Sequence, residues 1–177
     1  MFSIHTWIGT IRVDFSPDPF RIRRIWLPGT HHPEPYDPAA QSDSPQLTKY
    51  PPCPEMQILE KIIRDYFEFG KPLETPWQWL CPDHLRPLQK QVLQITALIP
   101  YGRVRTYRDI AVDLGKPAAA RFVGNALAAN PWPLLVPCHR VIRSSGAPGG
   151  FGGGTDMKAS LIRHETGAKH PVLVHRS

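Results

Sequence analysis

The sequence contains little cysteine and no long hydrophobic run, and both absences exclude classes of protein. Its three cysteines, Cys53, Cys81 and Cys138, are too few and too far apart for a disulfide framework, so free thiols are expected. No apolar stretch reaches the length of a membrane span, and the first residues lack the basic lead and cleavage site of a secretory signal. We therefore expect a soluble protein of the cytoplasm, or of the nucleus in a eukaryote, with no membrane partner.

Acidic residues are scarce in the second half of the chain, although the net charge of the whole is only +6. Residues 1–85 hold 8 Lys and Arg against 11 Asp and Glu, and residues 86–177 hold 13 against 4, which gives −3 and +9. A basic segment of this kind suits contacts with phosphate groups. A solvated basic surface without a partner has the same composition, so charge alone nominates nucleic acid without establishing it.

The first third of the sequence predicts a small antiparallel sheet covered by a helix. Apolar residues alternate through residues 2–27 on both sides of Gly9-Thr10, which fits a tight hairpin turn. Residues 28–54 contain eight prolines and favour a long loop, to which we assign no function. Residues 55–69 place apolar side chains on one helical face, and Phe69-Gly70 ends this helix. The alternating residues are Ile4, Thr6, Ile8, Ile11, Val13, Phe15, Phe20 and Ile22, with Ile25 or Trp26 after them, and the helical face holds Leu59, Ile62, Ile63 and Tyr66.

The remainder predicts a mainly helical second domain. A helical period from residue 88 to residue 99 opens it, and Thr106 can cap a short helix from Tyr107 to Leu114. A second helix over residues 118–129 follows a glycine-containing turn. Two such helices in a basic region are typical of a helix-turn-helix, although a plain helical hairpin has the same pattern. The expected inner positions are Leu88, Val92, Ile95 and Ile99 in the first helix and Ala119, Phe122, Val123 and Leu127 in the last.

A thiol stands beside an imidazole at Cys138-His139, after the apolar run 134–136, which predicts a buried strand. Cysteine attacks as a thiolate and needs a base or a positive field to form it. Neighbouring side chains on an extended backbone point to opposite faces, so contact requires a turn at Cys138 or a bridging water. Glu165, on a short helix capped by Thr155, is the nearest suitable carboxylate to orient the imidazole. A buried structural cysteine explains the pair equally simply.

Residues 149–154 contain five glycines around Phe151 and must form a loop whose backbone can approach a ligand closely. The string is similar to a dinucleotide-binding fingerprint. No strand leads into it, however, and no acidic residue follows at the required spacing, so we reject dinucleotide binding and expect no cofactor.

The segment from Asn130 to Ile142 resembles the active-site segment of the O6-alkylguanine-DNA alkyltransferases, also called methylated-DNA–protein-cysteine methyltransferases. The resemblance covers about residues 86–168. It continues through Ile99-Pro100-Tyr101-Gly102, Thr106-Tyr107, Ala120-Arg121, Val123-Gly124 and His164-Glu165.

The resemblance implies a role for each matching residue. Cys138 would take the alkyl group from O6 of guanine in a single displacement and keep it as a thioether. His139, acting through a water, and Glu165 would form the relay that yields the thiolate. Tyr107 would donate a proton near the base, and Asn130 would brace the turn before the active site. The implied DNA-binding residues are Thr106, Ala119, Arg121, Gly124 and Asn125, and the implied substrate pocket is Pro133, Val141, Phe151, Gly152 and Gly153.

The implied partner is double-stranded DNA containing O6-alkylguanine. A thiolate cannot reach O6 inside a paired duplex, so the base must be flipped out, and Arg121 would enter the stack in its place. Binding would use the minor groove with little sequence preference, by a protein that is monomeric in solution. The preferred alkyl group, activity on O4-alkylthymine and cooperative binding on DNA are left open by the sequence.

These observations together predict an α+β fold of two domains. Residues 1–82 form a small antiparallel sheet with a helix, ribonuclease-H-like, and carry the loop 28–54. Residues 83–177 form a mainly helical, winged-helix-like domain with the helix-turn-helix, which binds DNA and accepts the alkyl group. Some relatives bind zinc in the first domain. Here no metal is expected, because the candidate ligands lack a suitable spacing: His31, His32, Cys53, Cys81 and His84.

Two alternatives belong to other classes of protein. An alkyltransferase-like protein binds the lesion and recruits other repair factors, but such relatives lack the acceptor cysteine that is present here as Cys138. A cysteine hydrolase would use Cys138 and His139, but no oxyanion site is identified. The sequence also departs from the family at Phe151-Gly152, where members often carry a polar pair. This gives the hypothesis that a glycine-rich wall admits bulkier alkyl groups.

Overall fold

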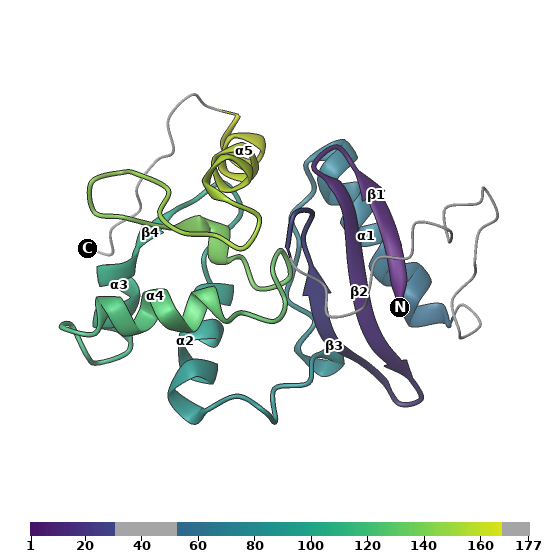
Figure 1. Cartoon of the computed structure of the whole chain (residues 1–177), viewed down its shortest axis with the longest axis horizontal. Helices are drawn as coiled ribbons and strands as arrows, with labels where there is room; N and C mark the ends of the chain where they lie inside the picture. Colours follow the sequence, from purple (N-terminus) through teal and green to yellow (C-terminus); the bar gives the residue numbers. More distant parts are fainter. Residues whose placement is uncertain (31–52, 168–177) are drawn as a thin grey trace.

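The computed structural model describes residues 1–30 and 53–167, which form an α+β fold as predicted. A sheet half (residues 1–30 and 53–82) lies beside a helical half (residues 83–167), as Figure 1 shows. Most of the predicted proline-rich loop, with His31 and His32, lies outside the described residues. In chain order the elements are β1 (Phe2–Thr6), β2 (Gly9–Pro17), β3 (Phe20–Trp26), α1 (Pro54–Phe69), the 3-10 turn η2 (Trp77–Trp79), α2 (Pro87–Ala97), β4 (Arg105–Thr106), α3 (Tyr107–Asp113), α4 (Ala120–Ala128), the 3-10 turn η3 (Cys138–Arg140), β5 (Val141–Ile142) and α5 (Thr155–Thr166).

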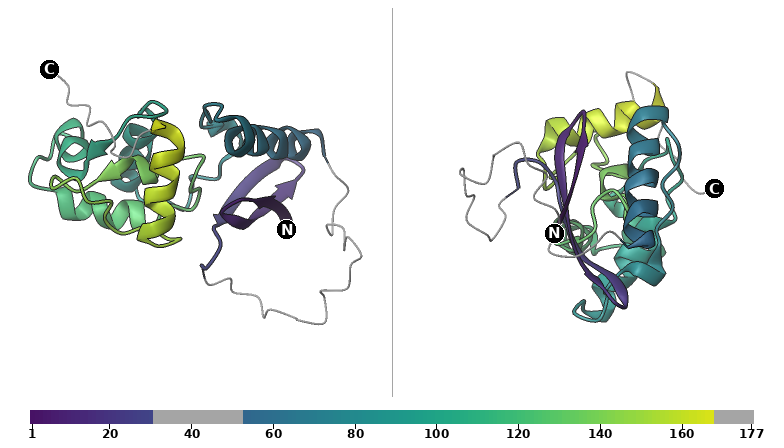
Figure 2. Two further views of the ribbon diagram at one scale, coloured as in Figure 1. Left: turned by 90° about the horizontal axis from the view of Figure 1, so that it is seen from above. Right: turned by 90° about the vertical axis from the view of Figure 1, so that its right-hand side faces the viewer.

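The alternation of apolar residues in the first strands produces one buried face of an antiparallel sheet, ordered β1-β2-β3. Helix α1 covers this face, as the two views in Figure 2 show. It ends at Gly70, which adopts the left-handed conformation and donates its N–H to the Tyr66 carbonyl oxygen at 3.1 Å. The predicted end of α1 is therefore confirmed. The buried residues at this interface are Ile4, Ile11, Val13, Phe15, Phe20, Ile22, Met56, Leu59, Ile63, Tyr66 and Phe67.

The hairpin turn lies two residues earlier than predicted. Strands β1 and β2 pair as far as Thr6 and Gly9, which leaves Trp7 and Ile8 as the turn. Gly9 is instead the first residue of β2, with a φ of 112° that side chains rarely allow. A Cβ at this position would lie 2.9 Å from Cγ of Pro28. The glycine is therefore needed by the strand that leaves the turn, and not by the turn itself.

The helical half differs from prediction in its boundaries and in one inner residue. Helix α2 ends at Ala97, so Ile99 is buried in the loop that follows. Helix α4 begins at Ala120 and turns Ala126 inward, which leaves Phe122 outside and 38% exposed. Thr106 caps α3 as predicted, and its hydroxyl and the Asp109 carboxylate form a reciprocal capping box.

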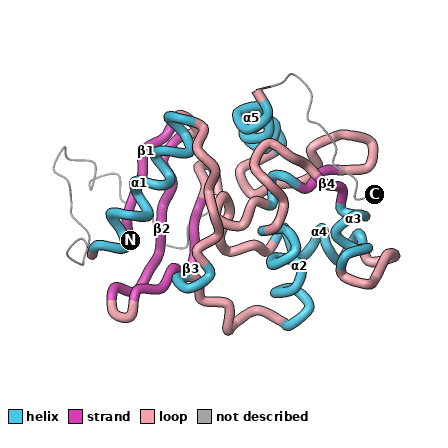
Figure 3. The backbone as a smooth tube through the Cα atoms, turned by 180° about the vertical axis from the view of Figure 1, so that it is seen from behind, coloured by secondary structure: helices cyan, strands magenta, loops and turns pink. Residues whose placement is uncertain are grey.

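The expected strand at residues 134–136 is absent from the described fold. An isolated bridge joins Pro133 to Val136, and Leu134 has a φ of 74°, which closes the segment into a loop. Neighbouring residues attach this loop to β3: the Ile25 N–H donates to the Pro131 carbonyl at 2.8 Å, and the Trp132 indole N–H donates to the Ile22 carbonyl at 3.0 Å. Figure 3 accordingly draws the backbone that lies in space between β3 and the helices of the helical half largely as loop.

Replacing Gly9 by alanine should lower the free energy of unfolding by about 2–3 kcal/mol, because the side chain meets both an unfavourable φ and the Pro28 ring. Gly29→Ala is the matched control: its φ is 77°, but no atom lies within 4 Å of an added Cβ. Its cost should be about 1 kcal/mol. Denaturant titration measures both values, and equal losses would show that the Pro28 contact has no energetic weight.

Candidate active site

Cys138 lies in a tight turn and not at the end of a strand. It begins η3 directly after Pro137, and its N–H donates to the Val136 carbonyl at 2.8 Å. Its side chain is only 6% exposed. The backbone therefore turns at Cys138, which is the condition stated above for contact between its thiol and the His139 side chain.

Asn130 holds the turn and the sulfur together. Its Nδ2 donates to the Val136 carbonyl at 3.0 Å and contacts Sγ of Cys138 at 3.2 Å, while its Oδ1 accepts from the Trp132 N–H at 3.0 Å. One side chain thus links the end of α4, the loop attached to β3 and the thiol.

The thiol is protonated at rest. Burial raises the pKa of Cys138, and the hydrogen bond from Asn130 and the positive charge of Lys158 oppose this only in part. Any reaction of the sulfur as a nucleophile therefore needs a base to take its proton.

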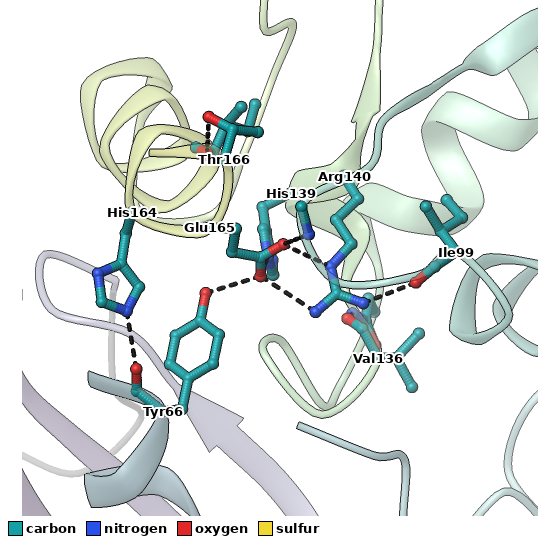
Figure 4. A network of polar contacts seen from close by, with 11 residues as sticks. Tyr66, Ile99, Val136, His139, Arg140, His164, Glu165 and Thr166 are labelled. Carbon is teal, nitrogen blue, oxygen red and sulfur yellow. Dashed lines mark hydrogen bonds and ion pairs between the residues drawn. The ribbon is translucent and has the colours of Figure 1, made fainter. Parts of the chain in front are cut away.

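The predicted pair of His139 and Glu165 is in direct contact. Nε2 of His139 lies 2.7 Å from Oε1 of Glu165, and both side chains are buried (Figure 4). Arg140 donates from Nε to Oε2 at 2.8 Å and from Nη2 to Oε1 at 3.0 Å. The hydroxyl of Tyr66 donates to Oε1 at 2.8 Å, and the Gly102 N–H donates to Oε2 at 3.2 Å. The helix α5 that carries Glu165 begins after Gly154, so the predicted cap at Thr155 is wrong by one residue.

These contacts fix the charge of each partner. Burial alone would raise the pKa of Glu165, but its interactions with His139 and with the Arg140 guanidinium, including the hydrogen bonds from both, outweigh burial and hold that pKa well below its usual range. Burial lowers the pKa of His139, and Glu165 offsets this only in part. The pair is therefore a carboxylate and a neutral imidazole that carries its proton on Nε2. Nδ1 of His139 is then an acceptor, and it is buried without a hydrogen bond to any described residue.

Lys158 is a site residue that our sequence analysis missed. It is 1% exposed, and its Nζ donates to the Tyr107 hydroxyl at 3.2 Å and to the Gly150 carbonyl at 3.3 Å. Burial lowers the pKa of Lys158 to about 8. Burial also raises the pKa of Tyr107, with the nearby Cys138 adding to the shift, so the phenol stays protonated. The available signal was helical spacing, because Lys158 shares one face of α5 with Leu161, Ile162 and Glu165.

A cleft of about 790 Å³ lies over α3, α4 and the glycine loop. Three arginines lie along it, Arg108, Arg121 and Arg143, and no acidic side chain in residues 1–30 or 53–167 forms an ion pair with them. Small residues of α4, Ala120, Gly124 and Ala128, are part of its lining. The full lining is Tyr107, Arg108, Ala120, Arg121, Gly124, Asn125, Ala128, Arg143, Ser144, Ser145, Gly149, Gly150, Phe151 and Gly152.

The cleft contains part of the predicted DNA-binding and pocket sets. Arg121, Gly124, Asn125, Phe151 and Gly152 line it. A Cβ at Gly152 would meet Thr30 at an ordinary 3.7 Å, whereas one at Gly149 would lie 2.8 Å from the Tyr107 hydroxyl.

Five other predicted residues lie outside this cleft. Thr106 is 4% exposed and its hydroxyl caps α3, so its contact with DNA stays a prediction. Pro133 and Val141 are buried, Val141 in the parallel pair of β4 with β5, so neither lines the cleft wall. Ala119 precedes α4 as its N-cap, and Gly153 lies against the Met157 side chain.

Among the described residues no cluster of His, Cys, Asp or Glu is arranged to hold a metal ion. The same part of the chain has no helix that is both long and apolar enough for a membrane span.

Comparison with known proteins points to one family. The sequence model for the DNA-binding domain of 6-O-methylguanine DNA methyltransferase matches residues 87–167. The methylated-DNA–protein-cysteine methyltransferase of Mycobacterium leprae is 48% identical over 85 residues, which are 48% of this chain and 50% of that protein. The match thus spans about half the length of this curated relative.

Solved structures extend the similarity to nearly the whole chain. The Mycobacterium tuberculosis OGT in complex with DNA superposes with a TM-score of 0.72 at 28% identity, over 93% of this chain and 91% of that one. A variant of OGT from the same organism has a TM-score of 0.67 at 30% identity, over 93% and 90% of the two chains. With this identity over nine-tenths of a relative's length, the chain belongs to the O6-methylguanine-DNA methyltransferase family.

Proposed function

We propose that this protein repairs DNA by direct reversal, moving the alkyl group of O6-alkylguanine onto Cys138 in a single turnover. The observation that carries the proposal is the buried thiol held by Asn130 next to a neutral imidazole whose partner is the Glu165 carboxylate. The protein is proposed to be a stoichiometric, self-inactivating transferase without cofactor. The lesion-binding alternative is disfavoured because an acceptor cysteine is present.

The proposed reaction begins with removal of the thiol proton. Nδ1 of His139 accepts this proton through one water, while Glu165 stabilises the resulting imidazolium at Nε2. The thiolate attacks the alkyl carbon in line with O6, so that the S–C bond forms as the C–O bond breaks. The electron pair of that bond stays on guanine, and Cys138 is left as a thioether.

The departing guanine needs a proton, which the Tyr107 hydroxyl supplies in this proposal. Lys158 donates a hydrogen bond to that hydroxyl and can return the proton, because its pKa of about 8 makes deprotonation easy near neutral pH. Tyr107 lines the cleft close to Gly149 of the glycine loop and to Gly124 of α4, so the proposed proton donor stands at the cleft wall.

Double-stranded DNA is the proposed partner, bound along the cleft through its minor groove. The small residues of α4 permit close approach of the backbone, and the arginines without acidic partners among the described residues suit phosphate contacts with little sequence preference. Arg121 is exposed on α4 and is proposed to fill the stack after the lesion flips out. We also propose that residues 1–82 and 83–177 are separate domains, ribonuclease-H-like and winged-helix-like, in a monomer.

Incubation with a duplex containing O6-methylguanine should add one methyl group to the peptide that contains Cys138. Mass spectrometry of the intact protein and of its peptides measures this, and Cys138→Ala should stay unmodified. Cys81→Ala is the matched control and should be methylated like the wild type, because Cys81 lies outside the turn. Unmodified wild-type protein that still binds the lesion would favour the non-enzymatic alternative, and more than one turnover would exclude the suicide mechanism.

Replacing Glu165 by glutamine should slow the transfer and lower the free energy of unfolding by about 3–5 kcal/mol, since Arg140 stays buried without its counter-charge. Glu60→Gln is the control: its pair with Arg64 is partly exposed, so its loss should cost less than about 1 kcal/mol.

The difference in the free energy of unfolding between the wild type and Glu165→Gln should also depend on pH. The pKa of Glu165 is lowered in the folded protein, so its stabilisation is complete above the pKa of an unfolded glutamate and fades as the pH falls through the folded value. Denaturant titrations of the wild type and of Glu165→Gln from neutral to acid pH measure this dependence. A constant difference between Glu165→Gln and wild type would contradict the ionised state assigned here.

Replacing Arg121 by alanine should slow transfer from a lesion in a duplex by about tenfold or more, because the flipped state loses its substitute in the stack. Transfer from free O6-benzylguanine should be unchanged, since no stack has to be opened. Arg64→Ala on α1 is the control, with both rates expected at the wild-type value. Equal slowing of both substrates in Arg121→Ala would place Arg121 in the chemical step instead.

A further inference from the structure

The relay contains a hydrogen bond that crosses from the sheet half to the helical half. Tyr66 lies in α1 and is 99 residues away in sequence from Glu165, yet its hydroxyl donates to Oε1 at 2.8 Å (Figure 4). The same oxygen faces Nε2 of His139 at 2.7 Å. A donor from one half of the molecule therefore shares an acceptor atom with the imidazole of the other half.

Tyr66 is held so that its hydroxyl has little freedom to leave this position. The residue is 1% exposed, and its ring packs edge-on against Phe67 and Tyr101 at centroid distances of 4.9 and 6.0 Å. Its carbonyl oxygen is 2.7 Å from Nε2 of His164, the residue before Glu165. Burial and the negative charge of Glu165 raise the pKa of Tyr66, so the phenol stays protonated and acts as a donor.

We propose that Tyr66 is a positioning residue of the relay, whose hydroxyl sets the orientation and proton affinity of Glu165 and, through Oε1, the basicity of His139. The inference rests on the proposed function for its kinetic consequence but not for its effect on the imidazole. A donor on Oε1 withdraws electron density that would otherwise stabilise the imidazolium. Tyr66 thus keeps His139 neutral at rest and ready to accept a proton.

The effect of Tyr66 on the pair of Glu165 and His139 can be distinguished from the effects of the other groups around that pair. The charged or titratable side chains that face Glu165 and His139 are Arg140 from η3, Lys158 and His164 from α5, Tyr101 from the loop after α2, and the thiol of Cys138. Among them Tyr101 resembles Tyr66 most closely, because it is a neighbouring tyrosine near Arg140, but no hydrogen bond joins it to Glu165 within the described residues.

The test uses Tyr66→Phe, which keeps the ring and removes only the hydroxyl, with Tyr101→Phe as the matched control. Titration of the His139 ring by NMR, assigned with His139→Gln, should show a pKa higher than in the wild type for Tyr66→Phe and the wild-type value for Tyr101→Phe. The acid limb of the pH–rate profile for transfer should move the same way. The ratio of rates at pH 5.5 and pH 8 should fall about threefold to tenfold, as expected for loss of one hydrogen bond to a charged group. Affinity for the lesion duplex should be unchanged.

A second variant tests the proposal even if Tyr66→Phe does not fold. Replacing Tyr66 by 3,5-difluorotyrosine makes the phenol a stronger donor at almost the same size, so the pKa of His139 should move down and not up. An unchanged titration in both variants, or an equal shift in Tyr101→Phe, would overturn the proposal and leave Tyr66 as a packing residue. If the wild type transfers no alkyl group, the proposed function fails, but the His139 titration still decides the role of Tyr66.

Discussion

Five hydrogen bonds meet at the carboxylate of Glu165, two from Arg140 and one each from His139, Tyr66 and the Gly102 N–H. A buried carboxylate is tolerated only when its oxygens are satisfied and its charge is balanced. Satisfying it here requires α1, the loop after α2, η3 and α5 to meet at one point. The Glu165 carboxylate therefore constrains how these four segments are placed relative to one another.

The thiol and the imidazole have opposite requirements that the structure meets by burying both. Burial raises the pKa of Cys138 and lowers that of His139, so both are neutral at rest. A neutral thiol is protected from adventitious oxidation, since the thiolate is the reactive form. In the proposed reaction the charged pair exists only transiently, with Glu165 beside the imidazolium and with Asn130 and Lys158 near the thiolate.

The sheet half supports this site through hydrogen bonds from several of its segments. Strand β3 binds the loop before Cys138 through Ile25 and Ile22, and α1 supplies the hydroxyl of Tyr66. Thr75, after α1, donates its hydroxyl to the Leu135 carbonyl at 2.5 Å in the same loop. A change in the sheet half can therefore alter the geometry around the thiol without touching the cleft.

The elements whose signals are local could be predicted from the residues alone, whereas the grouping of distant side chains could not. Alternation predicted the strands, helical periods predicted α1 to α4, and the cap at Thr106 and the stop at Gly70 follow from chemistry within a few residues. The pairing of His139 with Glu165 was also predicted, first because Glu165 is the nearest suitable carboxylate downstream and then through resemblance to a family, although 26 residues separate the two. An apolar run before Cys138 suits a strand equally well, and its closure into a loop follows from contacts with β3 that no local pattern encodes. The place of Tyr66 depends on how α1 meets α5, 99 residues away at Glu165, and the place of Lys158 depends on how α5 meets Tyr107 of α3, 51 residues away. Thr106 was predicted as a DNA-binding residue and Val141 as a pocket residue because their segments matched a family, and it is the pairing of β4 with β5 that buries both. Hydrogen bonds and burial act over a few ångströms in space, and such distances between remote residues arise only when the whole chain has folded.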